Sequence, residues 1–284
     1  MIPSGQSEPV HHLTVLAGFE IHVVEWGVGN PETVVLWHGL ARTSRDFDPL
    51  ARVLAARWRV LAVDTIGRGL SQWARDPAAD YCLAAYERLA LDLLERFGVM
   101  VPRWIGTSMG GALGIRLAGG VLRDRISHLV VNDIGPELPE PAVERILTYV
   151  SAPPVFDTIA ELEAWLRQVY APYGFLPGEQ WRQMALTSAR RADDGRITLH
   201  YDPRITEQFR HHPDDYDQWG AWQATTARTC LLRGADSDLL LPEVARRMSE
   251  TGPRPAVREV AKTGHAPALN VPGQIDPIVA FLKG

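Results

Sequence analysis

A serine with a glycine two residues before it and another two residues after it is the clearest candidate for chemistry in this sequence. Ser108 stands in the stretch Gly106-Thr107-Ser108-Met109-Gly110, between an expected strand and an expected helix. A serine in such a sharp turn projects its hydroxyl above the sheet, and only small residues at the two flanking positions leave room for the turn. The sequence therefore predicts that Ser108 is a nucleophile.

A histidine usually takes the proton of such a serine, and it must reach the same edge of the sheet. Of the 9 histidines, His265 is the best candidate because it follows an expected strand at 257–260 near the end of the chain. His38, which ends another expected strand, is expected instead to order its own loop by hydrogen bonding. The sequence therefore predicts that His265 is the base for Ser108.

The elements that hold these residues alternate along the chain between short apolar runs and helical patterns. This alternation is typical of a parallel sheet covered by helices, opened here by a hairpin with a turn at Ala17-Gly18. The expected strands are 13–16, 21–26, 33–37, 59–63, one ending near 106, 126–132, 229–233 and 257–260. The expected helices are 44–57, 81–97, 109–119, 242–249 and 272–283.

The alternation stops between residues 136 and 224, where proline pairs, helical patterns and many aromatic side chains replace the β-branched runs. This stretch is expected to be a mostly helical insertion. The predicted organisation is a core formed by residues 1–135 and 225–284, interrupted by the insertion at 136–224.

Four motifs occur in an order that resembles capped members of the α/β-hydrolase superfamily, among them esterases and meta-cleavage-product hydrolases. They are His38-Gly39-Leu40, the Gly-rich turn at 64–71, Gly106-Thr107-Ser108-Met109-Gly110-Gly111, and Gly264-His265. The resemblance covers nearly all of the chain except the insertion. It implies an α/β fold with a mostly parallel eight-stranded sheet flanked by helices, a helical cap at 136–224, and no metal or cofactor.

The resemblance also implies roles for further residues. The backbone N–H groups of Leu40 and Met109 would hold the oxyanion that forms during the reaction. Asp238 is the preferred acid for orienting His265, because it follows the strand before the last pair of helices, the usual place in the superfamily. Asp236, two residues earlier, and Asp133, where some members have their acid, remain alternatives. Asp64 is expected to shape a structural turn.

The composition excludes several kinds of partner. With 46% hydrophobic residues, 22% charged residues and a net charge of -5, the chain lies in the ordinary range of globular proteins. It contains no basic run and no apolar run of membrane-spanning length. We therefore expect a small-molecule substrate and neither a nucleic-acid nor a membrane partner, while the oligomeric state is left open.

The cysteines and the first residues bear on the compartment. Cys82 and Cys230 lie in separate apolar patterns, so we expect buried free thiols rather than a disulfide, which favours a reducing compartment. Residues 1–12 lack the basic start and the apolar stretch of a signal peptide. These features predict a cytoplasmic protein.

The leading functional hypothesis is hydrolysis of a carboxylic ester or related acyl bond through an acyl-enzyme. An alternative is hydrolysis of a carbon–carbon bond in a ring-cleavage dienoate, although Leu40-Ala41-Arg42 and Thr107 depart from the residues usual in such enzymes. A third hypothesis is a ligand-binding protein without catalysis. In the insertion, Arg190, Arg191 or Arg204 could bind a substrate carboxylate if it points inward.

Overall fold

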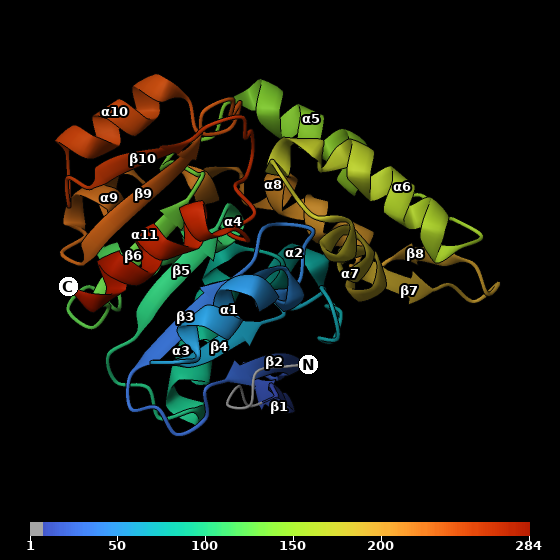
Figure 1. The fold of residues 1–284 in the computed structure, drawn as a ribbon, viewed down its shortest axis with the longest axis horizontal. Coiled ribbons are helices and arrows are strands. Elements are labelled where there is room, and N and C mark those ends of the chain that lie inside the picture. Colours follow the sequence, from blue (N-terminus) through green and yellow to red (C-terminus); the bar gives the residue numbers. More distant parts are fainter. Residues whose placement is uncertain (1–7) are drawn as a thin grey trace.

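The structure is a computed structural model that describes residues 8–284, and it contains an eight-stranded sheet between two layers of helices (Figure 1). The strand order is β1-β2-β4-β3-β5-β6-β9-β10, and β2 pairs antiparallel with β1 and β4 while every other pairing in this sheet is parallel. The strands are β1 (Val10–Leu16), β2 (Phe19–Trp26), β3 (Thr33–Trp37), β4 (Arg59–Val63), β5 (Arg103–Thr107), β6 (His128–Asn132), β9 (Arg228–Gly234) and β10 (Ala256–Val260). The predicted mostly parallel eight-stranded sheet is confirmed.

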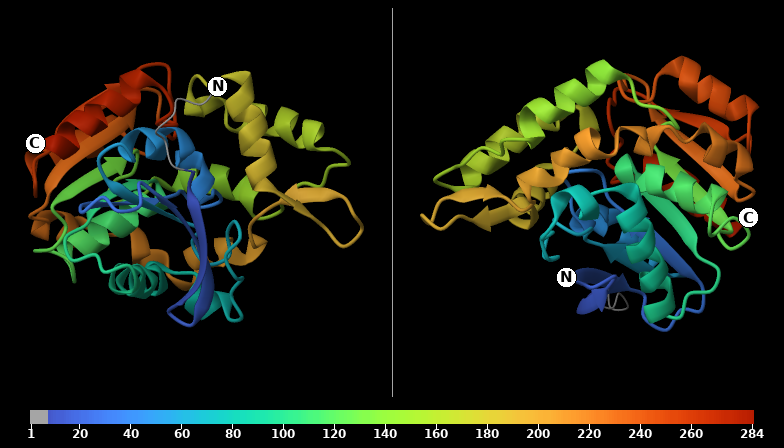
Figure 2. Two further views of the ribbon diagram at one scale, coloured as in Figure 1. Left: turned by 60° about the horizontal axis from the view of Figure 1, so that its bottom comes forward. Right: turned by 180° about the vertical axis from the view of Figure 1, so that it is seen from behind.

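The central strands are apolar throughout because both faces of the sheet are covered. Side chains alternate between the faces along a strand. In β3, Val34 and Leu36 belong to a core with α1 (Asp48–Leu54) and α11 (Pro272–Lys283), whereas Val35 and Trp37 belong to the core on the opposite face. That second core includes α3 (Leu83–Arg96), α4 (Met109–Gly119) and α10 (Pro242–Glu250). Figure 2 shows α3 and α4 on the face away from α1 and α11.

Some expected elements have different bounds. The helix expected at 44–57 is a 3-10 turn, η1 (Ser44–Phe47), followed by α1, and Pro49 lies in the first turn of α1, where a missing N–H is tolerated. A short helix, α2 (Pro77–Asp80), was not predicted. Of the polar segment at 1–12, residues 1–7 lie outside the described part of the chain, and β1 begins at Val10. Cys82 and Cys230 are buried free thiols, as predicted.

The segment between β6 and β9 is mostly helical. Its elements are α5 (Glu140–Val150), α6 (Ile159–Val169), η2 (Ala171–Tyr173), α7 (Gly178–Ser188), β7 (Ala189–Arg191), β8 (Ile197–Leu199), η3 (Pro203–Glu207), α8 (Gln208–His211), η4 (Pro213–Tyr216) and α9 (Trp219–Ala224). The antiparallel pair β7–β8 was missed, since three residues per strand are too few to produce a clear pattern. In Figure 1, α5, α6, α7 and this pair project to one side of the sheet.

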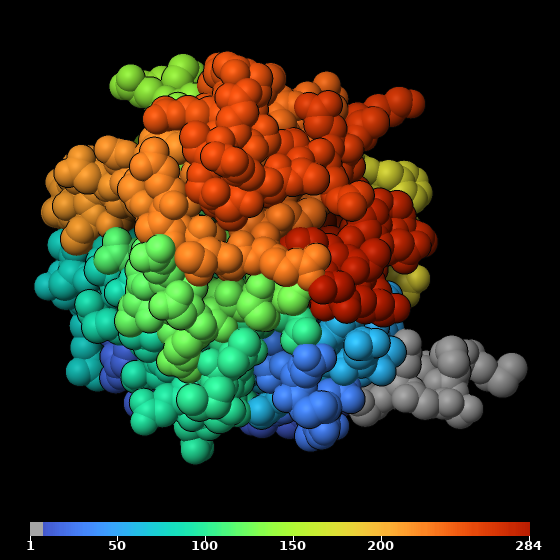
Figure 3. All heavy atoms as spheres, turned by 90° about the vertical axis from the view of Figure 1, so that its left-hand side faces the viewer, coloured from blue at the N-terminus to red at the C-terminus, as the bar shows by residue number. Residues whose placement is uncertain are grey.

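The last helix of the insertion differs from the rest because it packs on the core. A Cβ on Gly119 of α4 would collide with the backbone of Ala221, so α9 lies directly against α4. The sequence-based range 136–224 therefore includes a helix that covers the sheet as well as the projecting elements. Figure 3 shows that residues after the insertion, coloured orange to red, lie directly beside residues before it, coloured green and blue.

No helix within residues 8–284 has the length and apolar character needed to span a bilayer.

The core between the sheet and its helices contains large buried side chains. Trp37 and Trp104 stack with their ring centroids 5.3 Å apart, and both are fully buried. The Trp104 indole also donates a hydrogen bond to the carbonyl of Gly110 at 3.0 Å, which links the core to the turn that holds Ser108.

We expect Trp104→Ala to lower the free energy of unfolding by about 3–5 kcal/mol, because it removes a fully buried aromatic side chain and leaves a cavity. Urea unfolding followed by circular dichroism measures this change. Trp219→Ala is the control. Because Trp219 is only partly buried, its replacement should lower the free energy of unfolding much less. Equal losses in the two variants would contradict the burial argument.

Candidate active site

Ser108 occupies a strained turn between β5 and α4. Its backbone has φ 51° and ψ -120°, a conformation that non-glycine residues rarely adopt. A Cβ on Gly106 would collide with the carbonyl of Gly110, and a Cβ on Gly110 would collide with the carbonyl of Trp37. The two glycines therefore allow the close packing that holds the turn, in agreement with the steric argument from the sequence.

The imidazole of His265 lies between Ser108 and a buried carboxylate. His265 Nε2 is 2.9 Å from Ser108 Oγ, and His265 Nδ1 is 2.8 Å from Asp133 Oδ2. A carboxylate oxygen accepts, so Nδ1 carries the hydrogen, and in the neutral ring Nε2 is free to accept from the serine hydroxyl. The structure thus brings together the two residues that the sequence singled out, in the geometry that proton transfer requires.

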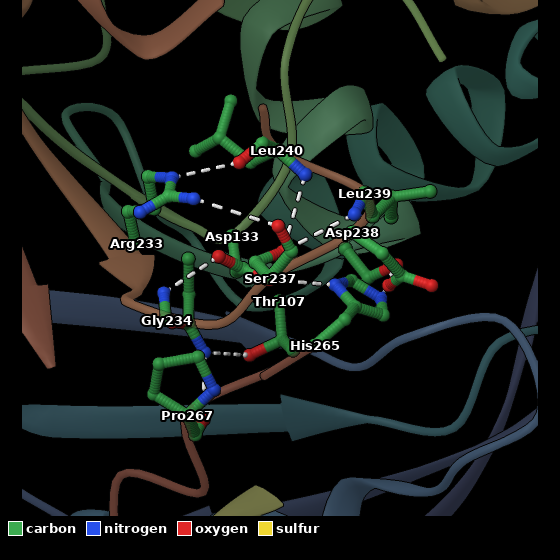
Figure 4. A network of polar contacts seen from close by, with 12 residues as sticks. Thr107, Asp133, Arg233, Gly234, Ser237, Asp238, Leu239, Leu240, His265 and Pro267 are labelled. Atoms are coloured by element: carbon green, nitrogen blue, oxygen red, sulfur yellow. Dashed lines mark hydrogen bonds and ion pairs between the residues drawn. The ribbon is translucent and has the colours of Figure 1, made fainter. Parts of the chain in front are cut away.

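The Asp133 carboxylate is fixed by three donors. Asp133 directly follows β6, and its side chain has no exposed surface. Oδ1 accepts from the backbone N–H of Gly234 at 2.8 Å, and Oδ2 accepts from the Ser237 hydroxyl at 2.7 Å as well as from His265 (Figure 4). This network holds the carboxylate in one orientation toward the imidazole.

The preference for Asp238 as the partner of His265 is wrong. Its carboxylate is about half exposed and binds Arg145 of α5 through Nε at 2.6 Å and Nη2 at 2.9 Å. Asp236 is also exposed. In this turn it is the intervening Ser237 that points inward, and it contacts Asp133, the third of the candidate carboxylates.

A signal for Asp133 was present in the sequence. It is an acidic residue directly after a fully buried strand, and it takes φ 59°, a region where aspartate is tolerated better than most residues. Asn132, to which the sequence assigned no role, is a polar residue at the end of that strand. Its Nδ2 donates to Thr107 Oγ1 at 3.0 Å and to the Pro267 carbonyl at 2.9 Å, so it joins the nucleophile turn to the loop of His265.

The loop after β3 passes directly beside the nucleophile. A Cβ built on Gly39 would lie 3.4 Å from the Cβ of Ser108. The next residue is Leu40, and Met109 begins α4. Within residues 8–284, neither the Leu40 nor the Met109 amide donates a hydrogen bond, so both N–H groups are available beside Ser108.

His38 orders this loop by hydrogen bonds, as predicted. Its Nδ1–H donates to the carbonyl of Gly39 at 2.7 Å, and its Nε2 accepts from the backbone N–H of Thr65 at 2.9 Å. Burial lowers the pKa of His38 from 6.5 to about 4, although the nearby Asp64 carboxylate opposes this change. His38 is therefore neutral at physiological pH.

This lowered pKa predicts a loss of stability in mild acid. Between pH 6.5 and about pH 4 the unfolded chain binds a proton at His38 that the folded chain does not, so the free energy of unfolding falls as the pH falls. The expected loss is about 2 kcal/mol between about pH 7.5 and about pH 5. Urea unfolding at both pH values, compared with His38→Gln, isolates this contribution. A variant with the same pH dependence as the wild type would contradict it.

Asp64 is structural, as expected. Its carboxylate accepts hydrogen bonds from the backbone N–H groups of Ser44 at 2.7 Å and Leu70 at 3.0 Å, and from His22 Nδ1 at 2.7 Å. Burial would raise the pKa of Asp64, but these hydrogen bonds and the nearby histidines lower it overall. Asp64 therefore ties the Gly-rich turn to the first strands.

A cavity of about 360 Å³ lies next to the Ser108–His265 pair. Gly39 and Thr107, which flank Ser108, line one part of it, and Ala266, which follows His265, lines another. Its outer wall comes from α7 and the segment before it. The residues of that wall are Tyr173, Leu176, Glu179, Gln180, Gln183 and Met184.

The three arginines considered for a substrate carboxylate have other contacts. Arg204 binds Asp202 at 2.7 Å, Arg191 donates to the carbonyl of Gly195, and Arg190 stacks on a tryptophan ring. None of the three is among the residues that line this cavity.

The chain is similar to known hydrolases along most of its length. The model of the alpha/beta hydrolase family matches residues 34–275. A 3-hydroxybutyrate-oligomer hydrolase from Cupriavidus necator is 37% identical over 270 residues, 92% of each chain. A crystal structure of an alpha/beta hydrolase from Novosphingobium aromaticivorans is 32% identical with a TM-score of 0.85, covering 97% of this chain and 98% of that one.

A more distant relative has a different substrate. A 2-(acetamidomethylene)succinate hydrolase from Mesorhizobium japonicum is 24% identical over 226 residues, 79% of this chain and 78% of that protein. These relatives are all named as hydrolases, but the substrates in their names differ. With the family match spanning most of its length, the chain is a hydrolase that belongs to the alpha/beta hydrolase family.

Proposed function

We propose that this protein hydrolyses carboxylic esters of small molecules through an acyl-enzyme on Ser108. The observation that carries the proposal is the continuous chain of hydrogen bonds from Ser108 through His265 to Asp133, with distances of 2.9 and 2.8 Å. Such a chain allows a serine to act as a nucleophile at neutral pH, because the imidazole takes its proton as the bond to carbon forms.

The reaction proceeds in two halves. Ser108 Oγ attacks the ester carbon while His265 Nε2 takes the hydroxyl proton, and the oxyanion that forms accepts hydrogen bonds from the Leu40 and Met109 amides. Two such donors supply about 3 kcal/mol of transition-state stabilisation each. His265 then gives the proton to the leaving alkoxide oxygen. A water molecule, deprotonated by His265, then attacks the acyl carbon. The bond from that carbon to Ser108 Oγ breaks, His265 returns the proton to Oγ, and the acid is released.

Asp133 orients the imidazole during these steps and stabilises its positive charge. Its position supports this role, because the carboxylate is buried and held by Gly234 and Ser237. No metal ion or cofactor takes part in the proposed reaction.

The substrate class comes from the relative that matches along most of both chains. Because the Cupriavidus necator protein is named as a hydrolase of 3-hydroxybutyrate oligomers, we propose short oligoesters of 3-hydroxy acids as substrates of this chain too. The cavity of about 360 Å³ lies at the lower end of the range for small-molecule sites, about 300–1,000 Å³.

Stopped-flow kinetics with p-nitrophenyl butyrate tests the chemistry. We expect a burst of p-nitrophenol equal to the enzyme concentration, followed by slower turnover, because acylation precedes hydrolysis of the acyl-enzyme. Release of monomer from the 3-hydroxybutyrate dimer, followed by chromatography, tests the substrate class. Failure to cleave either compound would overturn the proposal and favour the dienoate or ligand-binding alternative.

A further inference from the structure

The cavity beside the active site contains a buried arginine that is only partly paired. Arg42 lies two residues after Leu40, lines the cavity and is 3% exposed. Its Nε and Nη2 donate to the two carboxylate oxygens of Asp46 at 2.7 and 2.6 Å. Its Nη1 is buried and has no hydrogen-bond partner among residues 8–284. A buried guanidinium N–H without an acceptor is unfavourable, which points to a ligand as the missing partner.

Arg42 keeps its charge in this position. Burial opposes the charged form, but the Asp46 carboxylate raises the pKa of Arg42 above its ordinary value. The guanidinium also stacks on Tyr170, with Cζ 4.8 Å from the ring centroid. Asp46 and Tyr170 therefore fix the plane of the guanidinium while the Nη1 hydrogens remain unused, and arginine is the side chain best suited to bind a carboxylate.

The other charged groups of the cavity do not compete strongly for this role. Arg45 is paired with Asp48 at 2.6 Å, and Arg52 is exposed. The three arginines are formally balanced by Asp46, Asp48 and Glu179, so net charge would not attract an anion. Recognition of an anion would depend on the unused N–H groups of Arg42.

A second buried polar atom without a partner belongs to Asn270. This residue also lines the cavity, and its Nδ2 donates to the Phe175 carbonyl at 3.0 Å and to Gln180 Oε1 at 2.5 Å. Its Oδ1 has no donor within the described chain. The cavity thus has unsatisfied polar atoms on two core residues, Arg42 and Asn270, as expected of a site for a polar ligand.

The cavity adjoins the loop that follows His265. His265 gives its proton to the leaving oxygen, so the leaving group has to lie next to His265. Ala266, Pro267 and Ala268, which follow His265, line the cavity together with Thr107. A leaving group beside His265 therefore has room to extend into this cavity.

Building on the proposed esterase function, we infer that the cavity binds the leaving hydroxy-acid unit and that Arg42 holds its free carboxylate. The preferred substrates are then esters whose alcohol part carries a carboxylate, as in oligoesters of hydroxy acids. A chain of such units is shortened from its carboxylate end, one hydroxy acid at a time. A neutral cap on that carboxylate removes the recognised group.

The first test compares the 3-hydroxybutyrate dimer with its methyl ester. The ratio of kcat/KM for the free acid to kcat/KM for the methyl ester reports recognition of the carboxylate and cancels losses common to both substrates. In the wild type we expect a ratio well above one, and in Arg42→Met we expect it to fall about 10- to 100-fold, as for a lost charge-assisted hydrogen bond. A wild-type ratio of one or less, or an unchanged ratio in Arg42→Met, would overturn the inference.

Two further variants complete this test. Asn270→Asp places a negative charge in the same cavity without changing Arg42, so it should lower the ratio even if Arg42→Met does not fold. Arg190→Met is the control, because Arg190 stacks on Trp73 and does not line the cavity. If this ratio of kcat/KM values fell as far in Arg190→Met as in the cavity variants, or did not fall in Asn270→Asp, the result would contradict the carboxylate site.

The direction of cleavage gives a readout that needs no variant. A 3-hydroxybutyrate trimer with an isotope label in its carboxyl-terminal unit should release labelled monomer first, and unlabelled monomer first would overturn the inference. The p-nitrophenyl butyrate burst on the same preparation separates the two proposals. A burst with the wrong cleavage order contradicts only the carboxylate site, whereas no burst and no cleavage contradicts the esterase function itself.

Discussion

Alanine in place of Ser108 removes the p-nitrophenol burst and lowers steady-state hydrolysis at least about 10⁴-fold, the order of loss seen when a catalytic serine is deleted. The reason is that His265 then has no hydroxyl to deprotonate, so no acyl-enzyme forms. The backbone amides of Leu40 and Met109 remain, and they account for any slow residual hydrolysis. Stopped-flow and steady-state assays at matched protein concentration measure both quantities.

The control for this variant is Ser249→Ala. Ser249 lies on α10, and its hydroxyl bonds to the carbonyl of Arg246 within the same helix, so activity should stay at the wild-type level. Thermal unfolding of both variants checks that the fold is intact. A Ser108→Ala protein that still shows a full burst would overturn the assignment of the nucleophile.

Replacement of Asp133 by asparagine lowers kcat by about 10⁴-fold, because an amide no longer enforces the tautomer in which His265 Nε2 accepts from Ser108. The same change at Asp238 alters kcat less than about twofold, since its exposed pair with Arg145 contributes little. The two substitutions are chemically identical and differ only in position. Measuring kcat for both variants with p-nitrophenyl butyrate therefore decides between the two carboxylates.

The opposite outcome is a large loss of kcat in Asp238→Asn and a small one in Asp133→Asn. It would mean that the turn after β9, residues 236–238, rearranges in the working enzyme. Loss of activity in both variants would require a check of folding. Unfolding temperatures supply that check, and Asp133→Asn can keep a hydrogen bond from Gly234 through its amide oxygen.

The sequence singled out Ser108 and His265, which the structure places 2.9 Å apart, because the position of each is determined by local features. Ser108 needs Gly106 and Gly110 within two residues, and their packing requirements can be argued from the residue types alone. His265 follows the last strand of the sheet, and any side chain there lies near the carboxyl edge. These positions follow from the alternation of strands and helices, which the sequence displays clearly.

The sequence left three carboxylates open as the partner of His265, with Asp238 preferred over Asp133, because the choice depends on side-chain direction in a turn. Asp236, Ser237 and Asp238 are consecutive, and the sequence does not reveal which of them points inward. The structure turns Ser237 toward Asp133, and it is this contact that joins the turn to the imidazole network.

The same limit explains why Arg42 was not considered for substrate binding. In the sequence it stands out only as part of Leu40-Ala41-Arg42, which departs from the residues usual in carbon–carbon bond hydrolases of the superfamily. Its burial depends on the loop after β3 folding under Tyr170, which comes from a segment more than a hundred residues later in the chain. Contacts between segments so far apart leave no periodic pattern in the sequence.

The placement of the base after the insertion has a consequence for biosynthesis. Ser108 and Asp133 leave the ribosome before His265, which lies 157 residues after Ser108, and parallel strands such as β9 and β10 pair only after both are synthesised. On the proposed mechanism the nascent chain therefore carries Ser108 without its base. A chain that stops before His265 should then form no acyl-enzyme.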